Sequence, residues 1–175
     1  KVISENTNPL KIDHNGNNHF FSYLPMNHIA ERIVVEYTAF NYGGTISFVE
    51  SIDTFGDNLN SVQPTVFFAV PRIWTKFQQG ILSKISQRKL DVLLRLPFIS
   101  LLIKRKIIRG LGLSKAKNVF TGAAPTPISL IKWFARLGIN IQEAYAMTEN
   151  TCYSHVSFKE NIKIGSVGQA LPFCD

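Results

Sequence analysis

The sequence predicts an α/β fold, a layered sheet in which strands and helices alternate along the chain. Residues 65–70, Thr-Val-Phe-Phe-Ala-Val, are apolar and rich in β-branched and aromatic side chains, as is typical of a strand buried in a parallel sheet. Helical apolar patterns separate this stretch from other strand candidates, which favours parallel strands joined by right-handed crossovers. With 175 residues, 45% of them hydrophobic, the chain can bury a core.

The first half of the chain begins with polar sequence and then alternates. Residues 1–18 are rich in asparagine, and we expect them to form a loop or frayed terminus. A strand is predicted over 20–24, and Asn27 is expected to cap a helix that ends at Gly43. The next predicted elements are a strand over 45–49, a helix that starts near 53–54 and stops before Pro64, and the strand 65–70.

The second half continues the alternation. Pro71 suits the first turn of a helix, and the helical pattern runs on to about Leu94. Pro97 interrupts it, and a second helix is predicted over 99–109. The remaining predicted elements are a strand over 118–121, a helix over 127–137 and a strand over 139–145.

A loop of small residues, Gly122-Ala-Ala-Pro125, lies between a predicted strand and a predicted helix. In open α/β sheets, ligands bind beyond the carboxyl ends of the strands. Small side chains would let a flat base approach the backbone of this loop. Taken alone, the loop is equally consistent with a plain turn before a helix that starts at a proline.

A second motif, Glu143-Ala-Tyr-Ala-Met-Thr-Glu149, follows some twenty residues later, again at the end of a predicted strand. Tyr145 offers a ring face for stacking on a base. The Thr148 hydroxyl can bond a phosphate oxygen, and the Glu149 carboxylate can hold Mg2+. Taken alone, the Thr-Glu pair would also fit a helix cap.

In this order and spacing, the two motifs resemble the adenylate-forming superfamily, which includes acyl-CoA synthetases, luciferases and peptide-synthetase adenylation domains. The chain is most similar to long-chain fatty-acyl-CoA synthetases, and the resemblance covers about 20–172. Three further stretches carry it: Tyr23-Leu-Pro-Met-Asn-His-Ile-Ala-Glu-Arg32, Phe67-Phe-Ala-Val-Pro-Arg-Ile-Trp-Thr-Lys76 and Gly165-Ser-Val-Gly-Gln-Ala-Leu-Pro172.

The resemblance implies roles for individual residues. Tyr145 would stack on adenine, Thr148 would bond the α-phosphate and Glu149 would hold Mg2+, which makes Thr148 and Glu149 the implied catalytic pair. His28 would line the junction of the acyl and nucleotide pockets; by itself it would also fit a packed histidine at a helix start. The implied nucleotide-binding residues are Gly122, Ala123, Ala124, Pro125, Glu143, Ala144, Tyr145, Ala146, Met147 and Thr148.

The implied reaction is that of an AMP-forming long-chain fatty acid–CoA ligase using ATP, Mg2+ and coenzyme A. A fatty acid carboxylate attacks the α-phosphorus of ATP, and fixed donors and a cation stabilise the developing charge. The chain departs from the family pattern at Ala146, where glycine is usual and a methyl group could crowd the nucleotide. An aryl or medium-chain acid ligase is the nearer alternative.

The family also has a Ser/Thr/Gly-rich phosphate loop and a C-terminal lid domain with a catalytic lysine, and neither pattern occurs in this sequence. We therefore expect 1–175 to be the central part of the large N-terminal domain, inactive by itself. Cys152 and Cys174 have no disulfide or metal-site spacing, which favours a reduced, cytoplasmic setting.

Segment 84–109 is strongly basic. It holds eight basic residues and one acidic residue, Asp91, so it accounts for the whole net charge of +7. Apolar residues are interleaved with the charges, which suits peripheral contact with the anionic inner face of a membrane. A solvated helix face is the simpler alternative. Nucleic acid is not expected as a partner, because no aromatic interleaving accompanies the charge. A basic membrane- or nucleic-acid-binding module with degenerate nucleotide motifs is the rival to an enzyme.

Overall fold

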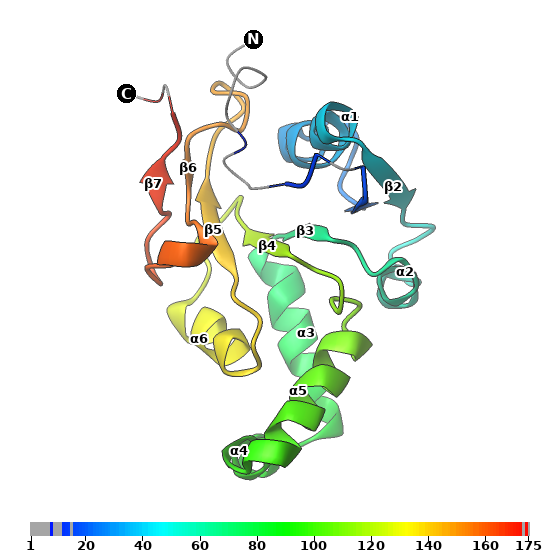
Figure 1. The fold of residues 1–175 in the computed structure, drawn as a ribbon, viewed down its shortest axis with the longest axis vertical. Helices are drawn as coiled ribbons and strands as arrows, with labels where there is room; N and C mark the ends of the chain where they lie inside the picture. The colour runs from blue at the N-terminus through cyan, green and yellow to red at the C-terminus, as the bar shows by residue number, and fades with distance from the viewer. Residues whose placement is uncertain (1–7, 9–11, 15, 173, 175) are drawn as a thin grey trace.

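The computed structural model describes residues 8, 12–14, 16–172 and 174. In this part of the chain seven strands form one mixed sheet in the order β2-β1-β3-β4-β5-β6-β7 (Figure 1). The strands from β2 to β5 are parallel to one another, and β6 and β7 are antiparallel to their neighbours. The predicted α/β fold is thereby confirmed. The strands are β1 Asn18–Ser22, β2 Gly44–Phe48, β3 Val66–Ala69, β4 Asn118–Thr121, β5 Gln142–Tyr145, β6 His155–Val156 and β7 Gln169–Ala170.

Helices connect the parallel strands. The connection from β1 to β2 is a π-helical segment, η1, that continues directly as the short helix α1. Three helices lie between β3 and β4, and one lies between β4 and β5. The helices are η1 Glu31–Tyr37, α1 Thr38–Tyr42, α2 Phe55–Val62, α3 Pro71–Lys84, α4 Gln87–Arg95, α5 Pro97–Gly110, α6 Ile128–Arg136 and the 3-10 turn η2 Lys159–Asn161.

The single helix predicted from Pro71 to about Leu94 was wrong, because the structure divides it into α3 and α4. Ile85 is extended, with φ −147° and ψ 124°, and Ser86 occupies the N-cap position of α4. The Ile85 side chain packs against the larger core, so the chain is held in place at the break. Pro71 stands at the first turn of α3, as predicted.

The start of the sheet also differs from the prediction. Strand β1 begins at Asn18, the last residue of the predicted loop 1–18, and the Asn18 amide donates hydrogen bonds to the backbone oxygens of Asp13 and Gly43 at 2.7 and 3.0 Å. Ile12 is buried in the core, so this part of the predicted loop is packed. Residues 1–7, 9–11 and 15 of that prediction lie outside the described residues.

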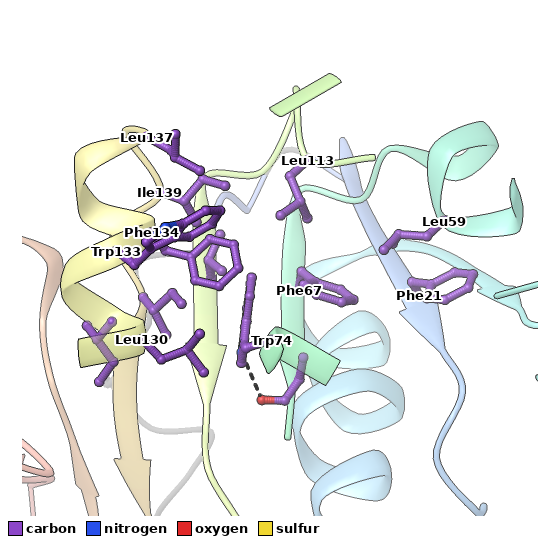
Figure 2. Packing of buried hydrophobic residues seen from close by; sticks show 14 of the residues in the cluster. Phe21, Leu59, Phe67, Trp74, Leu113, Leu130, Trp133, Phe134, Leu137 and Ile139 are labelled. Carbon is purple, nitrogen blue, oxygen red and sulfur yellow. Dashed lines mark hydrogen bonds between the residues drawn. The ribbon is translucent and has the colours of Figure 1, made fainter. Parts of the chain in front are cut away.

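One face of the sheet carries a large apolar core. Side chains of Phe21, Phe67 and Ile141 point to this face and meet α2, α3 and α6. At its centre, Trp74 is 0% exposed, and its ring lies 5.7 Å from Phe67 and 5.1 Å from Phe134 (Figure 2). The indole Nε1–H donates to the backbone oxygen of Ala69 at 3.2 Å, so the core satisfies its polar atom as well.

The opposite face is covered by η1 and α1. Phe20, Val66 and Phe120 point to it and pack against Val35 and Ala39. Since strand side chains alternate between the two faces of a sheet, Phe20 and Phe21 are buried in two different cores. Fewer buried residues form this second core, and a cavity lies on this face.

Replacing Trp74 tests the larger core. Trp74→Ala should lower the free energy of unfolding by about 3–5 kcal/mol, because a fully buried aromatic ring is lost and a cavity remains. Urea unfolding followed by circular dichroism measures the change. The control Phe40→Ala removes a ring that is 92% exposed and should shift the free energy by less than about 0.5 kcal/mol. Equal effects of the two substitutions would contradict the core assignment.

Candidate functional site

The small-residue loop begins directly after β4. A buried hydrogen bond of 2.9 Å between the hydroxyls of Thr121 and Thr126 closes the loop at its base. Ala123 has φ 66°, in the left-handed region that costs a non-glycine residue about 1 kcal/mol. Ala123, Ala124 and Pro125 are exposed. The loop therefore presents small side chains outward from a fixed base.

Gly122 has a packing reason to be glycine. A Cβ at this position would lie 3.0 Å from the backbone oxygen of Ala144 and 3.2 Å from the Phe68 ring. Thr121 pairs with Glu143 in the β4–β5 register, so Gly122 stands level with Ala144. The two sequence motifs thus come together at the carboxyl ends of two adjacent parallel strands.

The chain after β5 forms a tight turn. Met147 N–H donates to Asn150 Oδ1 at 2.9 Å, and Cys152 N–H donates to the Met147 oxygen at 3.0 Å. Thr151 and Cys152 both have φ 57°. This backbone leaves Thr148 and Glu149 exposed at the surface beside the β4 loop motif. Their predicted roles stay predictions.

Glu143 and Tyr145 lie on β5 in different surroundings. The Glu143 carboxylate accepts a hydrogen bond from Gly165 N–H at 2.9 Å, which ties the Gly165 turn to the sheet. The nucleotide role that sequence reasoning gave Glu143 stays a prediction, and the structure adds this tethering contact through Oε2. Tyr145 is 47% exposed, and its ring lies 6.2 Å from the His155 ring in an edge arrangement.

His28 is exposed at the start of the helix that continues into η1. Its Nδ1 accepts a hydrogen bond from Ala30 N–H at 3.1 Å, so His28 caps this helix and the predicted Asn27 cap was wrong. Because Nδ1 is the acceptor, the neutral ring carries its proton on Nε2. That N–H is a hydrogen-bond donor for a ligand beside His28.

A cavity of about 290 Å³ lies between the η1–α1 segment and the sheet face of β3, β4 and β5. It brings His28 together with six of the predicted nucleotide residues: Gly122, Ala123, Ala144, Ala146, Met147 and Thr148. Ala124, Pro125, Glu143, Tyr145 and Glu149 do not line it. Its remaining lining is mostly apolar and comes from Ile29, Ala30, Ile33, Val34, Tyr37, Phe68, Phe120, Cys152, Tyr153, Val156 and Leu171, with Asn8, Thr38, Tyr42 and His155.

Sequence reasoning missed the helical wall of this cavity. Ile29, Ile33 and Tyr37 recur at the helical spacing of any helix that packs on a sheet, so the pattern could not separate a ligand wall from ordinary core. The wall is also π-helical: Thr38 N–H bonds the Ile33 oxygen, and the Thr38 hydroxyl donates to the same oxygen at 2.8 Å. Such segments are rare and occur often at functional sites.

Sequence reasoning also missed Glu31, which is only 1% exposed. Its Oε2 accepts a hydrogen bond from Leu24 N–H at 3.4 Å, and among the described residues its Oε1 has no hydrogen-bond partner. Burial raises the pKa of this carboxyl, and the Ser22 hydroxyl and Leu24 N–H only partly oppose that shift. Glu31 therefore links the chain after β1 to the cavity wall through its bond with Leu24 N–H, and its buried carboxyl loses the hydration that would stabilise its charge.

No group of three or more His, Cys, Asp or Glu side chains that could hold a metal occurs in the described part of the chain. Glu149 offers one exposed carboxylate. Mg2+ usually keeps several waters and binds one or two carboxylates together with substrate phosphates. A single carboxylate such as that of Glu149 would fit this ion if Thr148 binds phosphate as predicted. No helix among the described residues is long and apolar enough to cross a membrane.

Comparison with known proteins identifies the family. The model for AMP-binding enzymes matches residues 3–175. The chain belongs to this family. The two motif loops and the cavity lie within the matched region.

Curated relatives are fatty-acid ligases. The chain is 26% identical to the long-chain-fatty-acid–CoA ligase ACSBG2 of Gallus gallus over 181 residues, 87% of this chain and 24% of the relative. It is 28% identical to the putative fatty-acid–CoA ligase fadD11 of Mycobacterium tuberculosis, over 86% of this chain and 32% of the relative. The chain thus spans 24% to 32% of the length of these relatives.

Solved structures share the fold. The N-terminal domain of FACL13 from Mycobacterium tuberculosis superposes with a TM-score of 0.67 at 22% identity, covering 93% of this chain and 36% of that one. The A-PCP didomain of a carboxylic acid reductase from Segniliparus rugosus, in complex with AMP, gives 0.58 at 21% identity, covering 79% and 19%.

The buried carboxyl of Glu31 in this AMP-binding protein should make the stability of the fold depend on pH. The raised pKa means that the folded state holds the Glu31 proton at pH values where the unfolded state, with a pKa near 4.5, has released it. Stability should therefore fall as pH rises from that value through the folded pKa. Glu31→Gln removes this penalty, so it should raise Tm relative to the unsubstituted protein more at pH about 8 than at pH about 4, measured by calorimetry. A larger gain at the lower pH would contradict the assignment.

Proposed function

We propose that the full-length protein is an ATP-dependent fatty acid–CoA ligase, and that this chain supplies its acyl pocket and one wall of its nucleotide site. One observation carries the proposal: a mostly apolar cavity adjoins both motif loops at the carboxyl ends of β4 and β5. An apolar acid held in such a cavity would have its carboxylate beside the loops. The names of the curated relatives agree with this substrate class.

The chain's own groups fit the first half-reaction. The acid carboxylate attacks the α-phosphorus of ATP, pyrophosphate leaves and an acyl-adenylate forms; the thiol of coenzyme A then attacks the acyl carbon and AMP leaves. His28 Nε2–H can hold the carboxylate, since the cap bond fixes the ring through Nδ1. The Thr148 hydroxyl can bond the α-phosphate from the same cavity.

Glu149 and Tyr145 lie outside the cavity and would act on the nucleotide side. The half-exposed ring of Tyr145 would stack on adenine. Glu149 would hold Mg2+, which supplies positive charge to the phosphate oxygens when bound. Among the described non-glycine residues, positive φ occurs at Gln63, Ala123, Thr151 and Cys152, so the backbone at Ala146 does not require glycine.

The cavity volume supports a second candidate substrate. At about 290 Å³ it lies just below the roughly 300–1,000 Å³ usual for ligand pockets. A medium-chain or aryl acid would fill it more completely than a long acyl chain. Both candidates use the same adenylation chemistry and the same residues.

Removing the Glu149 charge tests the nucleotide site in the full-length protein. Glu149→Gln should lower the adenylation rate by roughly 10²-fold or more, the scale lost with one preorganised stabilising group. Acid-dependent pyrophosphate exchange at saturating Mg2+ measures this rate. The exposed Glu160→Gln serves as a matched control and should leave the rate unchanged. Unchanged exchange in Glu149→Gln would remove this carboxylate from the site.

Narrowing the cavity tests the acyl pocket. Val34→Trp fills part of the space between η1 and the sheet, so kcat/KM for palmitate should fall by about 10²-fold while short acids lose less. Phe40→Trp, at a position 92% exposed, is the control on the adjoining helix. The measurement is acyl-CoA formation across acids of increasing length. If Val34→Trp leaves the dependence on chain length unchanged, the acyl group does not bind in this cavity. The Glu149→Gln test of the nucleotide site does not depend on that result.

A further inference from the structure

The junction of α4 and α5 exposes an apolar surface. Residues 95–99, Arg-Leu-Pro-Phe-Ile, are all exposed, and Phe98 is 87% exposed. The next turn of α5 adds Leu101 and Leu102, the latter 65% exposed, and α4 adds Val92. We call 84–109 the basic hairpin, and Val92, Leu96, Phe98, Ile99, Leu101 and Leu102 its apolar tip.

The hairpin is firmly anchored, so the exposure of its tip does not come from loose packing. Leu90 of α4 is fully buried in the larger core, and Leu94 packs beside it. Ile103, Ile107 and Ile108 of α5 pack against the same core. Each helix thus has an inward apolar stripe and, on its other side, apolar residues that meet water. Large exposed apolar patches mark interaction surfaces.

Exposed basic side chains lie on both helices of the hairpin. Arg88, Lys89 and Arg95 are exposed on α4, and Arg105, Lys106 and Arg109 are exposed on α5. The one acidic residue of the hairpin, Asp91, forms an ion pair with Arg136 and accepts a hydrogen bond from Gln87 at 2.8 Å. Its charge is therefore already compensated, and the hairpin combines uncompensated positive charge along its helices with an exposed apolar tip.

The hairpin also lies away from the candidate site. In Figure 1, α4 and the start of α5 form the end of the molecule opposite α1, β6 and β7. The candidate site is formed by η1 and by the loops that follow β4 and β5. Contacts at the hairpin can therefore change without altering the residues of the site.

We propose that the basic hairpin docks the protein on an anionic lipid bilayer. The apolar tip, led by Phe98 and Leu102, enters the boundary between head groups and acyl chains, while the arginine and lysine side chains meet lipid phosphates. Long basic side chains suit this arrangement, because their stems cover apolar surface and their charges stay in water. A nucleic acid would match the charge but would leave the apolar tip in contact with water.

Vesicle binding by the full-length protein tests the proposal. The protein should sediment with phosphatidylcholine vesicles that contain 30% phosphatidylserine, bind pure phosphatidylcholine far less, and lose binding as salt rises. The triple substitution Arg95→Gln, Arg105→Gln, Lys106→Gln should lower the partition coefficient by about 10²-fold, since each basic residue near the surface contributes about 1 kcal/mol.

Phe98→Asp tests whether the apolar tip inserts into the bilayer. Insertion distinguishes a lipid bilayer from a partner that is bound through its negative charge alone. The substitution should lower vesicle binding at least tenfold, and an aspartate in the first turn of α5 is compatible with the helix. Phe40→Asp, at a position 92% exposed on α1, is the matched control for the ring. Replacing the exposed Lys115, Lys132 and Lys163 with glutamine is the matched control for the charge. Both controls should bind like the unsubstituted protein, and all variants should keep pyrophosphate exchange.

Three results would overturn the proposal. The first is no binding of the unsubstituted protein to phosphatidylserine vesicles, as expected if another part of the full-length protein covers the hairpin. The second is full vesicle binding by Phe98→Asp, which would leave charge alone as the cause. The third is tighter binding to a DNA duplex than to the vesicles, indifferent to Phe98→Asp, which would identify a nucleic-acid surface.

Discussion

The alternation of large apolar side chains along the central strands is the constraint on which the rest of the structure depends. In β1, Phe20 points to one face and Phe21 to the other, and in β3 Phe67 and Phe68 divide in the same way. Both faces must therefore be covered. The face with Phe67 is filled by residues of α2, α3, α4, α5 and α6, with Trp74 of α3 at the centre. The face with Phe68 is covered by η1 and α1, which leave the cavity between them and the sheet.

The helical wall of that cavity is positioned by polar contacts at its start. Glu31 bonds Leu24 N–H, and His28 caps the helix through Ala30 N–H. These two bonds fix the path of the chain from β1 into η1. The buried carboxyl opposes folding by its desolvation, so the structure tolerates an electrostatic cost at the segment that places His28 on the cavity.

Local chemistry made much of the fold predictable. The apolar run of β3, the proline at the start of α3 and the small loop after β4 were recognisable because each meets a local requirement of the backbone. The break at Ile85, the π-helical form of η1 and the short strands β6 and β7 depend on contacts distant in sequence, so local patterns carried no signal for them. The cavity wall was hidden for a related reason. Ile33 and Val34 have the spacing of an ordinary core helix, and only the three-dimensional arrangement shows that space remains beside them.

The spacing of the two motifs has a structural cause. One crossover helix, α6, carries the chain from the end of β4 back to the start of β5, and a parallel connection needs about that length. The register then sets Thr121 beside Glu143, so that Gly122 lies against the backbone of Ala144 with no room for a Cβ. A side chain at Gly122 would have to push β4 and β5 apart or displace Phe68 from the cavity. The distance between the motifs in sequence and the glycine in the first of them are thus two consequences of the same parallel pairing, which is why their combination identified the family when each motif alone did not.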